Sequence, residues 1–265
     1  MIGCGIDAGS RAMKVVLMDA ADRRVISAAT ADQRPDQSEL AIELTGQALK
    51  NAGVQAKDIK RTVGTGYGRR VLTQADTTIT EITCQARGVR SLLPEAQVIV
   101  DIGGQDSKVI VLGEQGVRDF AMNDRCAAGT GQFLEMVAQR LGFSLAELGV
   151  HAARSLQPAV INSTCAVFAE TEIISLLASG MTPEDISAGV LRSVANRVAS
   201  LSHPGSTAAV VFTGGAARIQ GMDKFLSQAL GQPVIIAPDP HLTAARGAAL
   251  FACDQIDPGR RGGGE

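Results

Sequence analysis

The sequence DAGSRAMK at Asp7–Lys14 decides the fold, because its pattern returns as DIGGQDSK at Asp101–Lys108. Both copies read Asp-x-Gly-x-x-x-x-Lys. An apolar run precedes each copy and another follows it, which predicts a strand, a tight turn and a second strand, with an acid at the end of the first strand. Two related halves with such hairpins can face each other across a cleft.

The residue types in these turns suit a bound nucleotide. Glycines let backbone N–H groups approach a phosphate closely, and Asp7 and Asp101 can hold a hydrated magnesium ion. The apolar run that ends at Thr213 predicts a buried strand leading into Gly214-Gly215, whose backbone could lie against an adenine or a ribose. That glycine pair alone could merely turn the chain, but the two hairpins favour a ligand. The residues expected to contact ATP are Gly9, Ser10, Lys14, Gly103, Gly104, Gln105, Gly214, Gly215 and Ala216.

This combination resembles the actin-like ATPase fold of sugar kinases and heat-shock chaperone ATPases. That α/β, ribonuclease H-like fold has two duplicated lobes around a nucleotide cleft. The resemblance covers nearly the whole chain, from the first phosphate loop to an adenosine motif at Thr213–Gly221. It implies that Glu81 helps to position the attacking water, with Asp7 and Asp101 as the other catalytic residues. The alternative for Glu81 is a carboxylate at a helix N-terminus, stabilised by the helix dipole.

The composition argues against several classes of function. An apolar content of 45% and a mean hydropathy of +0.13 predict a packed core. A net charge of -2, 3% aromatic residues and the absence of tryptophan give no case for nucleic acid or an anionic membrane. No apolar run approaches the ~20 residues that span a bilayer, and no signal peptide is evident. We therefore expect a cytoplasmic protein.

Apolar periodicity and turn residues place the remaining elements. A β-β-β-α-β-α order begins at the N-terminus and starts again at Val98, which indicates an internal duplication. One lobe is expected at 1–94 plus 240–256, the second at 95–239, and a disordered tail at 257–265. Strands are expected at 2–7, 13–19, 24–30, 61–65, 208–213 and 234–237. Helices are expected at 39–52, 81–93, 132–141, 166–179, 183–201 and 244–253.

Two of the five cysteines occupy unusual positions. Cys126 (in MNDRCAAGTG) and Cys165 (in NSTCAVFAE) each come directly before a predicted helix, whose N-terminus stabilises a thiolate. Two thiolates cannot complete a tetrahedral site, but two chains related by a two-fold axis would supply four. For an arbitrary cysteine, a buried structural role is the better expectation. That role is expected for Cys4, Cys84 and Cys253, and a disulfide framework is not expected.

Four long motifs together resemble one family. They are GTGYGR at Gly64–Arg69, DIGGQD at Asp101–Asp106, NDRCAAGTG at Asn123–Gly131 and STCAVFAETE at Ser163–Glu172. They are typical of the BadF/BadG/BcrA/BcrD ATPases, which activate (R)-2-hydroxyacyl-CoA dehydratases or form the ATP-binding subunits of benzoyl-CoA reductase. The resemblance implies one [4Fe–4S] cluster per dimer, held by Cys126 and Cys165 of each subunit. It also implies that ATP hydrolysis delivers a low-potential electron to a partner enzyme.

Alternative functions remain open at this point. A sugar or metabolite kinase of the same fold would leave the cysteines inert, although no sugar-binding aspartate or substrate insert is evident. A chaperone-like ATPase with interfacial zinc is a third possibility. The first loop, with Arg11 in place of the usual threonine, departs slightly from the family pattern. The sequence leaves open whether a dehydratase or a reductase is the partner, and whether the dimer is a homodimer or a heterodimer with a homologous subunit.

Overall fold

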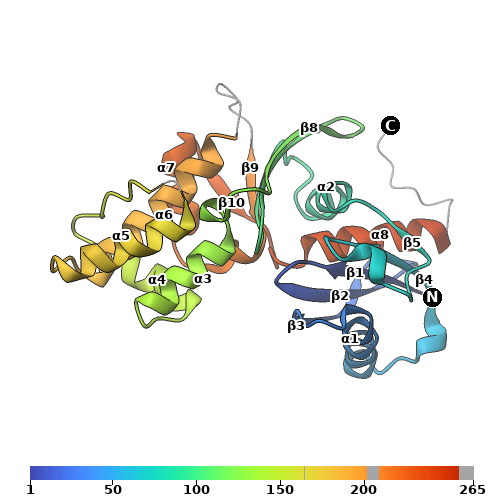
Figure 1. Ribbon diagram of the computed structural model, residues 1–265. Helices are drawn as coiled ribbons and strands as arrows, with labels where there is room; N and C mark the ends of the chain where they lie inside the picture. Colours follow the sequence, from blue (N-terminus) through green and yellow to red (C-terminus); the bar gives the residue numbers. More distant parts are fainter. Residues whose placement is uncertain (164, 202–208, 257–265) are drawn as a thin grey trace. The chain divides into compact units, whose positions relative to one another are not determined.

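The computed structural model describes residues 1–163, 165–201 and 209–256 and divides the chain into two compact units (Figure 1). Of the described residues, unit 1 comprises Met1–Pro94, Glu114–Val117 and Leu242–Ile256. Unit 2 comprises Glu95–Gly113 and Arg118–His241. The tail expected at 257–265 lies outside the described residues.

Unit 1 is a five-stranded mixed sheet with helices on both faces. The strand order is β3-β2-β1-β4-β5, with β1 antiparallel to β2 and parallel to β4. Its elements are β1 Ile2–Ala8, β2 Ala12–Asp19, β3 Val25–Asp32, α1 Gln37–Ala52, β4 Ile59–Thr65, β5 Thr77–Thr78, α2 Glu81–Leu92 and α8 Thr243–Ile256.

The alternation along β1 decides how unit 1 packs. Ile2, Cys4 and Ile6 are buried in one hydrophobic cluster with α1. Gly3 and Gly5 point the other way, where a Cβ on Gly5 would lie 2.1 Å from the carbonyl oxygen of Ala245 in α8. Glycine therefore lets α8 lie directly on the backbone of the sheet. Helix α1 begins where the Asp36 side chain accepts a hydrogen bond from the Glu39 amide, and it ends at the left-handed Gly53.

Unit 2 repeats this sheet. The order is β10-β9-β6-β7-β8, with β6 antiparallel to β7 and parallel to β9. Its strands are β6 Val98–Ile102, β7 Ser107–Gly113, β8 Gly116–Asn123, β9 Val210–Thr213 and β10 Val234–Ile236. Its helices are α3 Gly131–Arg140, α4 Leu145–Ala152, α5 Ala166–Ala178, α6 Pro183–Ala199 and α7 Met222–Leu230.

The core of unit 2 lies between the sheet and its helices. Val98, Val100 and Ile102 of β6 are buried in one cluster with the apolar faces of α3 and α6. Helix α6 starts at the expected place, because Thr182 accepts a hydrogen bond from the Asp185 amide and Pro183 occupies the first turn. The strand orders β3-β2-β1-β4-β5 and β8-β7-β6-β9-β10 are equivalent. This confirms the internal duplication expected from the sequence.

The expected elements are present with shifts of a few residues at their ends, and two helices were missed. These are α4 and α7, in stretches for which the sequence led us to expect no helix or strand. Among the described residues, no helix has the length and apolar character needed to cross a bilayer.

Candidate functional site

The first hairpin positions its aspartate by strand pairing. Asp7, near the end of β1, lies opposite Lys14 of β2, and the Lys14 Nζ is 3.0 Å from Asp7 Oδ2. Asp7 is 4% exposed. Its other oxygen, Oδ1, is buried and lacks a hydrogen-bond partner within the part of the chain that the structure describes. A buried carboxylate oxygen of this kind suits a magnesium ion or its bound water.

A glycine loop closes around the same aspartate. Thr65, the last residue of β4, pairs with Asp7, and Gly66 follows with φ at 88°. A Cβ on Gly66 would lie 2.3 Å from Asp7 Oδ1, and the Gly68 amide donates to the carbonyl of Ala8 at 2.8 Å. The GTGYGR motif was expected only as a mark of the family, and its place beside the aspartate was not predicted. The signal was the glycine spacing directly after a predicted strand.

The rest of the first loop is more open. Gly9 and Ser10 are half-buried, and the Gly9 carbonyl accepts a hydrogen bond from Gln33 Nε2 at 2.7 Å. A Cβ on Gly9 would lie 2.8 Å from Lys14 Nζ. Unit 1 thus brings Asp7, Gly9, Ser10 and Lys14 together around one turn.

The second hairpin has the same register in unit 2. Asp101 of β6 lies opposite Lys108 of β7 and beside Thr213 of β9. The hydroxyl of Thr213 donates to Asp101 Oδ1 at 2.9 Å. Lys108 Nζ lies 3.6 Å from Asp101 Oδ2 and 2.8 Å from Asp106 Oδ1, and it is buried. Asp106 and Thr213 lie in the predicted second phosphate loop and adenosine motif, but neither was assigned a role of its own.

The loop after Asp101 is bonded to the start of α3. The carbonyls of Gly103 and Gly104 accept hydrogen bonds from the amides of Gly131 and Gln132 at 2.9 and 2.8 Å. The side chain of Gln105 is exposed. This loop therefore reaches solvent at Gln105 while its glycines are fixed to the segment that follows Cys126.

The predicted adenosine motif forms a tight turn at the end of β9. Gly214 has φ at 87°, and a Cβ there would lie 2.4 Å from the carbonyl oxygen of Ile102 and 2.9 Å from Asp101 Oδ1. Gly215 opens a 3₁₀ turn at Gly215–Arg218 and is exposed, with open space at its Cβ position. Ala216 is buried in the core of unit 2. Its side chain therefore packs against the fold, unlike the open Gly215.

Glu81 is the first residue of α2 in unit 1. Thr80 caps this helix by accepting a hydrogen bond from the Thr83 amide at 3.3 Å. Burial raises the pKa of the nearby Cys84 thiol to about 12, and the carboxylates of Asp7 and Glu81 contribute in the same direction. The negative charges of Asp7 and Glu81 therefore both disfavour ionisation of the Cys84 thiol.

The five cysteines fall into two groups. Cys4, Cys84 and Cys253 are buried in unit 1, and desolvation raises the pKa of each thiol, to about 12, 12 and 11 respectively. Cys126 is half-buried and Cys165 is exposed, and both belong to unit 2. The prediction of a structural role for the first three is consistent with their burial.

The structure corrects the setting of Cys126. The residue does not open an α-helix; it precedes a 3₁₀ turn at Ala127–Gly129, and α3 begins only after Thr130. Thr130 has an extended backbone and donates its hydroxyl to the Ala127 carbonyl at 2.7 Å, which ends the turn. Asn123 holds Cys126 from both sides, accepting from its amide at 3.1 Å and donating to its carbonyl at 2.8 Å. The expected helix dipole therefore does not act directly on this thiol.

Cys165 occupies the expected position at the start of α5. The Glu172 carboxylate, on the same helix, accepts hydrogen bonds from the amides of Asn162 and Ser163 at 2.9 and 2.8 Å. Burial opposes ionisation of Glu172, but these hydrogen bonds outweigh it and hold its pKa below the ordinary value. Helix α5 also contacts the 3₁₀ turn after Cys126. The two cysteine-bearing segments therefore meet in unit 2.

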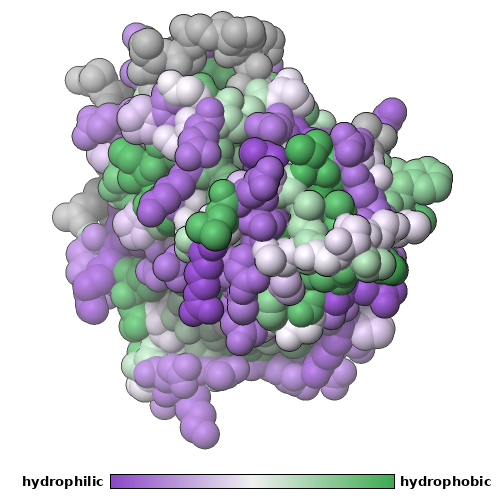
Figure 2. All heavy atoms as spheres, turned by 90° about the vertical axis from the view of Figure 1, so that its left-hand side faces the viewer, coloured by the Kyte–Doolittle hydropathy of each residue, from purple (hydrophilic) through white to green (hydrophobic). Residues whose placement is uncertain are grey.

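The surface beside Cys165 is apolar. Val167 and Phe168 are 69% and 70% exposed, and Ile174 on the same helix is also exposed. Figure 2 shows hydrophobic side chains as separate patches among hydrophilic ones on one face of the molecule. Patches of exposed aromatic and aliphatic side chains are typical of a surface that another protein covers. Among the described residues, no group of three or more His, Cys, Asp and Glu side chains is arranged to hold a metal ion.

Comparisons with known proteins agree with these motifs. The sequence profile of the BadF/BadG/BcrA/BcrD ATPase family matches residues 4–252. The activator of lactoyl-CoA dehydratase from Anaerotignum propionicum is 41% identical, over 95% of this chain and 97% of that protein. A benzoyl-CoA reductase component from Thauera aromatica is 33% identical, over 94% of this chain and 92% of its own length.

A solved structure gives the same result for the fold. The activator of the 2-hydroxyisocaproyl-CoA dehydratase from Clostridium difficile, with bound ADPNP, superposes with a TM-score of 0.93 at 38% identity. The alignment covers 98% of this chain and 97% of that one. The fold is therefore the expected actin-like ATPase fold, in the α/β class.

Proposed function

The chain belongs to the BadF/BadG/BcrA/BcrD ATPase family, and on that basis we propose that it is an ATP-hydrolysing activator of a CoA-thioester enzyme. Its partner is a 2-hydroxyacyl-CoA dehydratase or a benzoyl-CoA reductase component. In this proposal it hydrolyses ATP and passes one low-potential electron to the partner. Support comes from the named activities of its relatives and from the split of its cysteines into a buried and an accessible group.

The nucleotide part of the proposal rests on the duplicated aspartates. Asp7 and Asp101 would hold Mg-ATP through water, and Asp7 Oδ1, which has no hydrogen-bond partner among the described residues, is available for this. Gly9, Ser10, Lys14, Gly103, Gly104 and Gln105 would contact phosphates, and Gly214, Gly215 and Ala216 the nucleoside. Glu81 would orient the attacking water. The ADPNP bound in the C. difficile relative supports a nucleotide as ligand.

The cysteines carry the redox part. Cys126 and Cys165 are the two thiols with solvent access, and their segments meet in unit 2. Two thiolates from this chain and two from a second copy, or from a homologous subunit, would complete the four ligands of a [4Fe–4S] cluster. The exposed Val167 and Phe168 beside Cys165 give such a second subunit an apolar surface to cover. When bound, the cluster would supply one-electron transfer at low potential.

Coupling between nucleotide and cluster has a route within unit 2. The carbonyls of Gly103 and Gly104 are bonded to the first amides of α3, and that helix follows the Cys126 turn. A shift of the second phosphate loop during hydrolysis would therefore move the segment next to Cys126. The division into lobes expected from the sequence, with the cluster cysteines in the second lobe, is part of this proposal.

The test is anaerobic purification followed by metal analysis. We expect brown protein with about two irons per chain, which is four irons shared by two chains. Cys126→Ser and Cys165→Ser should each lose the iron and weaken the dimer. Cys253→Ala is the matched control, because that thiol is buried in unit 1, and it should keep the iron. Zinc without iron in the wild-type protein would contradict the redox proposal.

Two further measurements separate the parts of the proposal. Oxygen should bleach the cluster within minutes to hours, because it would lie at a subunit interface with few ligands from each side. A chelator should remove iron faster with ATP than with ADP, since a shift of the second phosphate loop with ATP bound would move the Cys126 segment and open the cluster toward the partner. Equal rates with both nucleotides would contradict the coupling and leave the cluster itself intact.

A further inference from the structure

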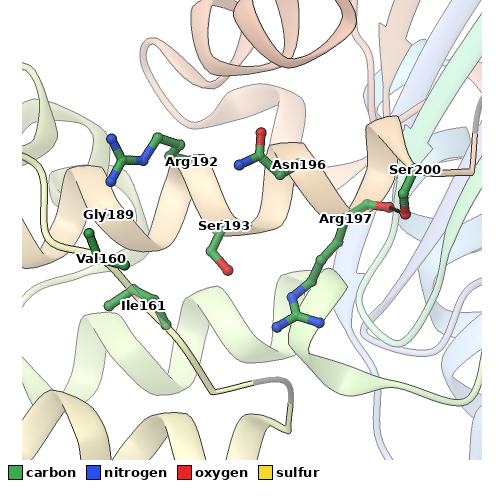
Figure 3. A pocket seen from close by; sticks show the side chains of 8 residues that line it. All are labelled: Val160, Ile161, Gly189, Arg192, Ser193, Asn196, Arg197 and Ser200. Carbon is green, nitrogen blue, oxygen red and sulfur yellow. Dashed lines mark hydrogen bonds between the residues drawn. The ribbon is translucent and has the colours of Figure 1, made fainter.

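One arginine contacts the segment before Cys165 and also borders the cavity at Cys126. Arg197 lies in the last turn of α6, and its Nη2 donates to the carbonyl of Ser163 at 2.8 Å. Figure 3 shows this side chain leaving α6 toward the segment that continues from Ile161. The Ser163 amide is held from the other side by Glu172. Both polar groups of this residue, two positions before Cys165, are therefore fixed by charged side chains.

Arg197 also lies beside Cys126. Arg197 and Cys126 line one cavity of about 560 Å³ in unit 2. A Cβ placed on Gly129, in the turn after Cys126, would lie 3.8 Å from the Cβ of Arg197. The start of the Arg197 side chain thus packs against the Cys126 turn while its guanidinium holds the Cys165 segment.

The charge of Arg197 is available to the cavity. Within the described part of the chain, the guanidinium forms no ion pair, and its Nε is buried without a hydrogen-bond partner. A half-buried cation without an ion-pair partner lowers the free energy of added negative charge at its neighbours. Cys126 lines the same cavity, together with Asp124 and Arg125, and Cys165 follows two positions after the bonded Ser163, so a negatively charged group held by the two sulfurs would lie near this cation.

We propose that Arg197 is a positioning residue that ties the Cys165 segment to the wall of the Cys126 cavity and favours the reduced state of the group the two thiols bind. This inference rests on the cluster proposed above. It assigns a role to a residue outside the four sequence motifs of the family.

A second arginine on α6 provides a matched control. Arg192 donates by Nη2 to the carbonyls of Pro158 and Ala159 at 3.3 and 2.9 Å, at the start of the same segment. Both arginines line a second cavity of about 440 Å³ (Figure 3), but Arg192 does not line the cavity with Cys126. The two side chains therefore make the same kind of bond, and of these two only Arg197 borders both cysteine segments.

The experiment compares Arg197→Gln, Arg197→Lys and Arg192→Gln in the full chain. In metal-free protein, hydrogen exchange of a peptide spanning the Cys165 segment should be about tenfold faster in Arg197→Gln, as expected for loss of one charge-assisted hydrogen bond. In anaerobic protein, iron loss to a chelator should accelerate by a similar factor. The EPR-monitored midpoint potential should become more negative.

Arg197→Lys keeps the charge and loses the planar fork. Its midpoint should stay near the wild-type value while hydrogen exchange rises. Arg192→Gln should change exchange near Pro158 and leave the midpoint unchanged. Wild-type exchange and midpoint in Arg197→Gln would overturn the inference. Wild-type protein without iron would instead overturn the proposed function, and the exchange measurement would still decide whether Arg197 fixes the segment.

Discussion

The two Asp-x-Gly hairpins share their strand register and differ in the surroundings of their aspartates. In unit 2, Asp101 Oδ1 accepts the Thr213 hydroxyl, and a buried lysine lies between Asp101 and Asp106. In unit 1, Asp7 Oδ1 has no partner among the described residues, and Lys14 remains partly exposed. The two hairpins therefore share their backbone arrangement. Asp101 is held by Thr213 and Lys108, whereas Asp7 Oδ1 has no partner among the described residues.

This difference suggests a division of roles. A carboxylate with a spare, preorganised oxygen can bind a cation or its water with little rearrangement. A carboxylate held by a hydroxyl and a lysine fixes the loop around it. We therefore expect the contribution of Asp7 to ATP hydrolysis to depend on its charge. The contribution of Asp101 should depend also on its neighbours Thr213 and Lys108.

Removing either aspartate charge should have the largest effect. Asp7→Asn and Asp101→Asn should each lower ATP hydrolysis by roughly 100-fold or more, because each weakens the hold on the magnesium ion that would neutralise the transferred phosphoryl group. Iron content should stay at the wild-type level in both. Steady-state phosphate release with varied magnesium measures this, and full turnover in Asp101→Asn would remove that residue from the proposed mechanism.

The lysines of the two hairpins should contribute unequally to the free energy of unfolding of the protein. Lys108→Met removes the buried cation between the buried Asp101 and the partly exposed Asp106, and it should lower the free energy of unfolding by about 3 kcal/mol. Lys14 has a side chain that is 17% exposed, so water can partly replace it beside the buried Asp7, and Lys14→Met should cost less, about 2 kcal/mol. Denaturant unfolding of both variants gives the comparison. Equal losses would show that the two hairpins are equivalent in stability.

Two threonines test the hydrogen bond from a hydroxyl group to the aspartate, which is present at Asp101. Thr213→Val removes the hydrogen bond to Asp101 while keeping the size of the side chain, and ATP hydrolysis should fall about tenfold, as for a buried bond to a charged acceptor. Thr65→Val, at the equivalent position beside Asp7, is the control and should have a smaller effect. The reverse order of the two effects would contradict the asymmetry.

Glu81 should give the smallest effect. If it orients the water, Glu81→Gln should lower kcat by more than the few-fold change expected from the loss of a helix N-terminal charge. Measuring kcat and thermal stability together separates the two roles. A change of only a few fold, with an equal loss of stability, would return Glu81 to a structural role at the start of α2.

Much of the fold and part of the site could be predicted from the sequence, because local patterns specify them. The alternation in β1, the twice-used Asp-x-Gly turn and the Thr182-Pro183 helix start each depend on neighbouring residues only. The short helices α4 and α7 were missed although each carries a local signal. The capping box from Ser144 to Glu147 starts α4, and the left-handed Gly231 ends α7. Helices of this length have too few turns to produce a clear periodic pattern.

The sequence by itself determined the family, the duplicated α/β architecture and the identity of the two cysteines that differ from the rest. Only the tertiary structure decided which groups surround them. Thr213 meets Asp101 across 112 positions of sequence, and Arg197 meets Ser163 across 34. Such contacts depend on which strands pair and which helices pack, and no local pattern encodes a distance between residues so far apart in the chain. The 3₁₀ turn after Cys126 also depends on tertiary structure. It leads through Thr130 into α3, and the first amides of α3 donate hydrogen bonds to the second phosphate loop.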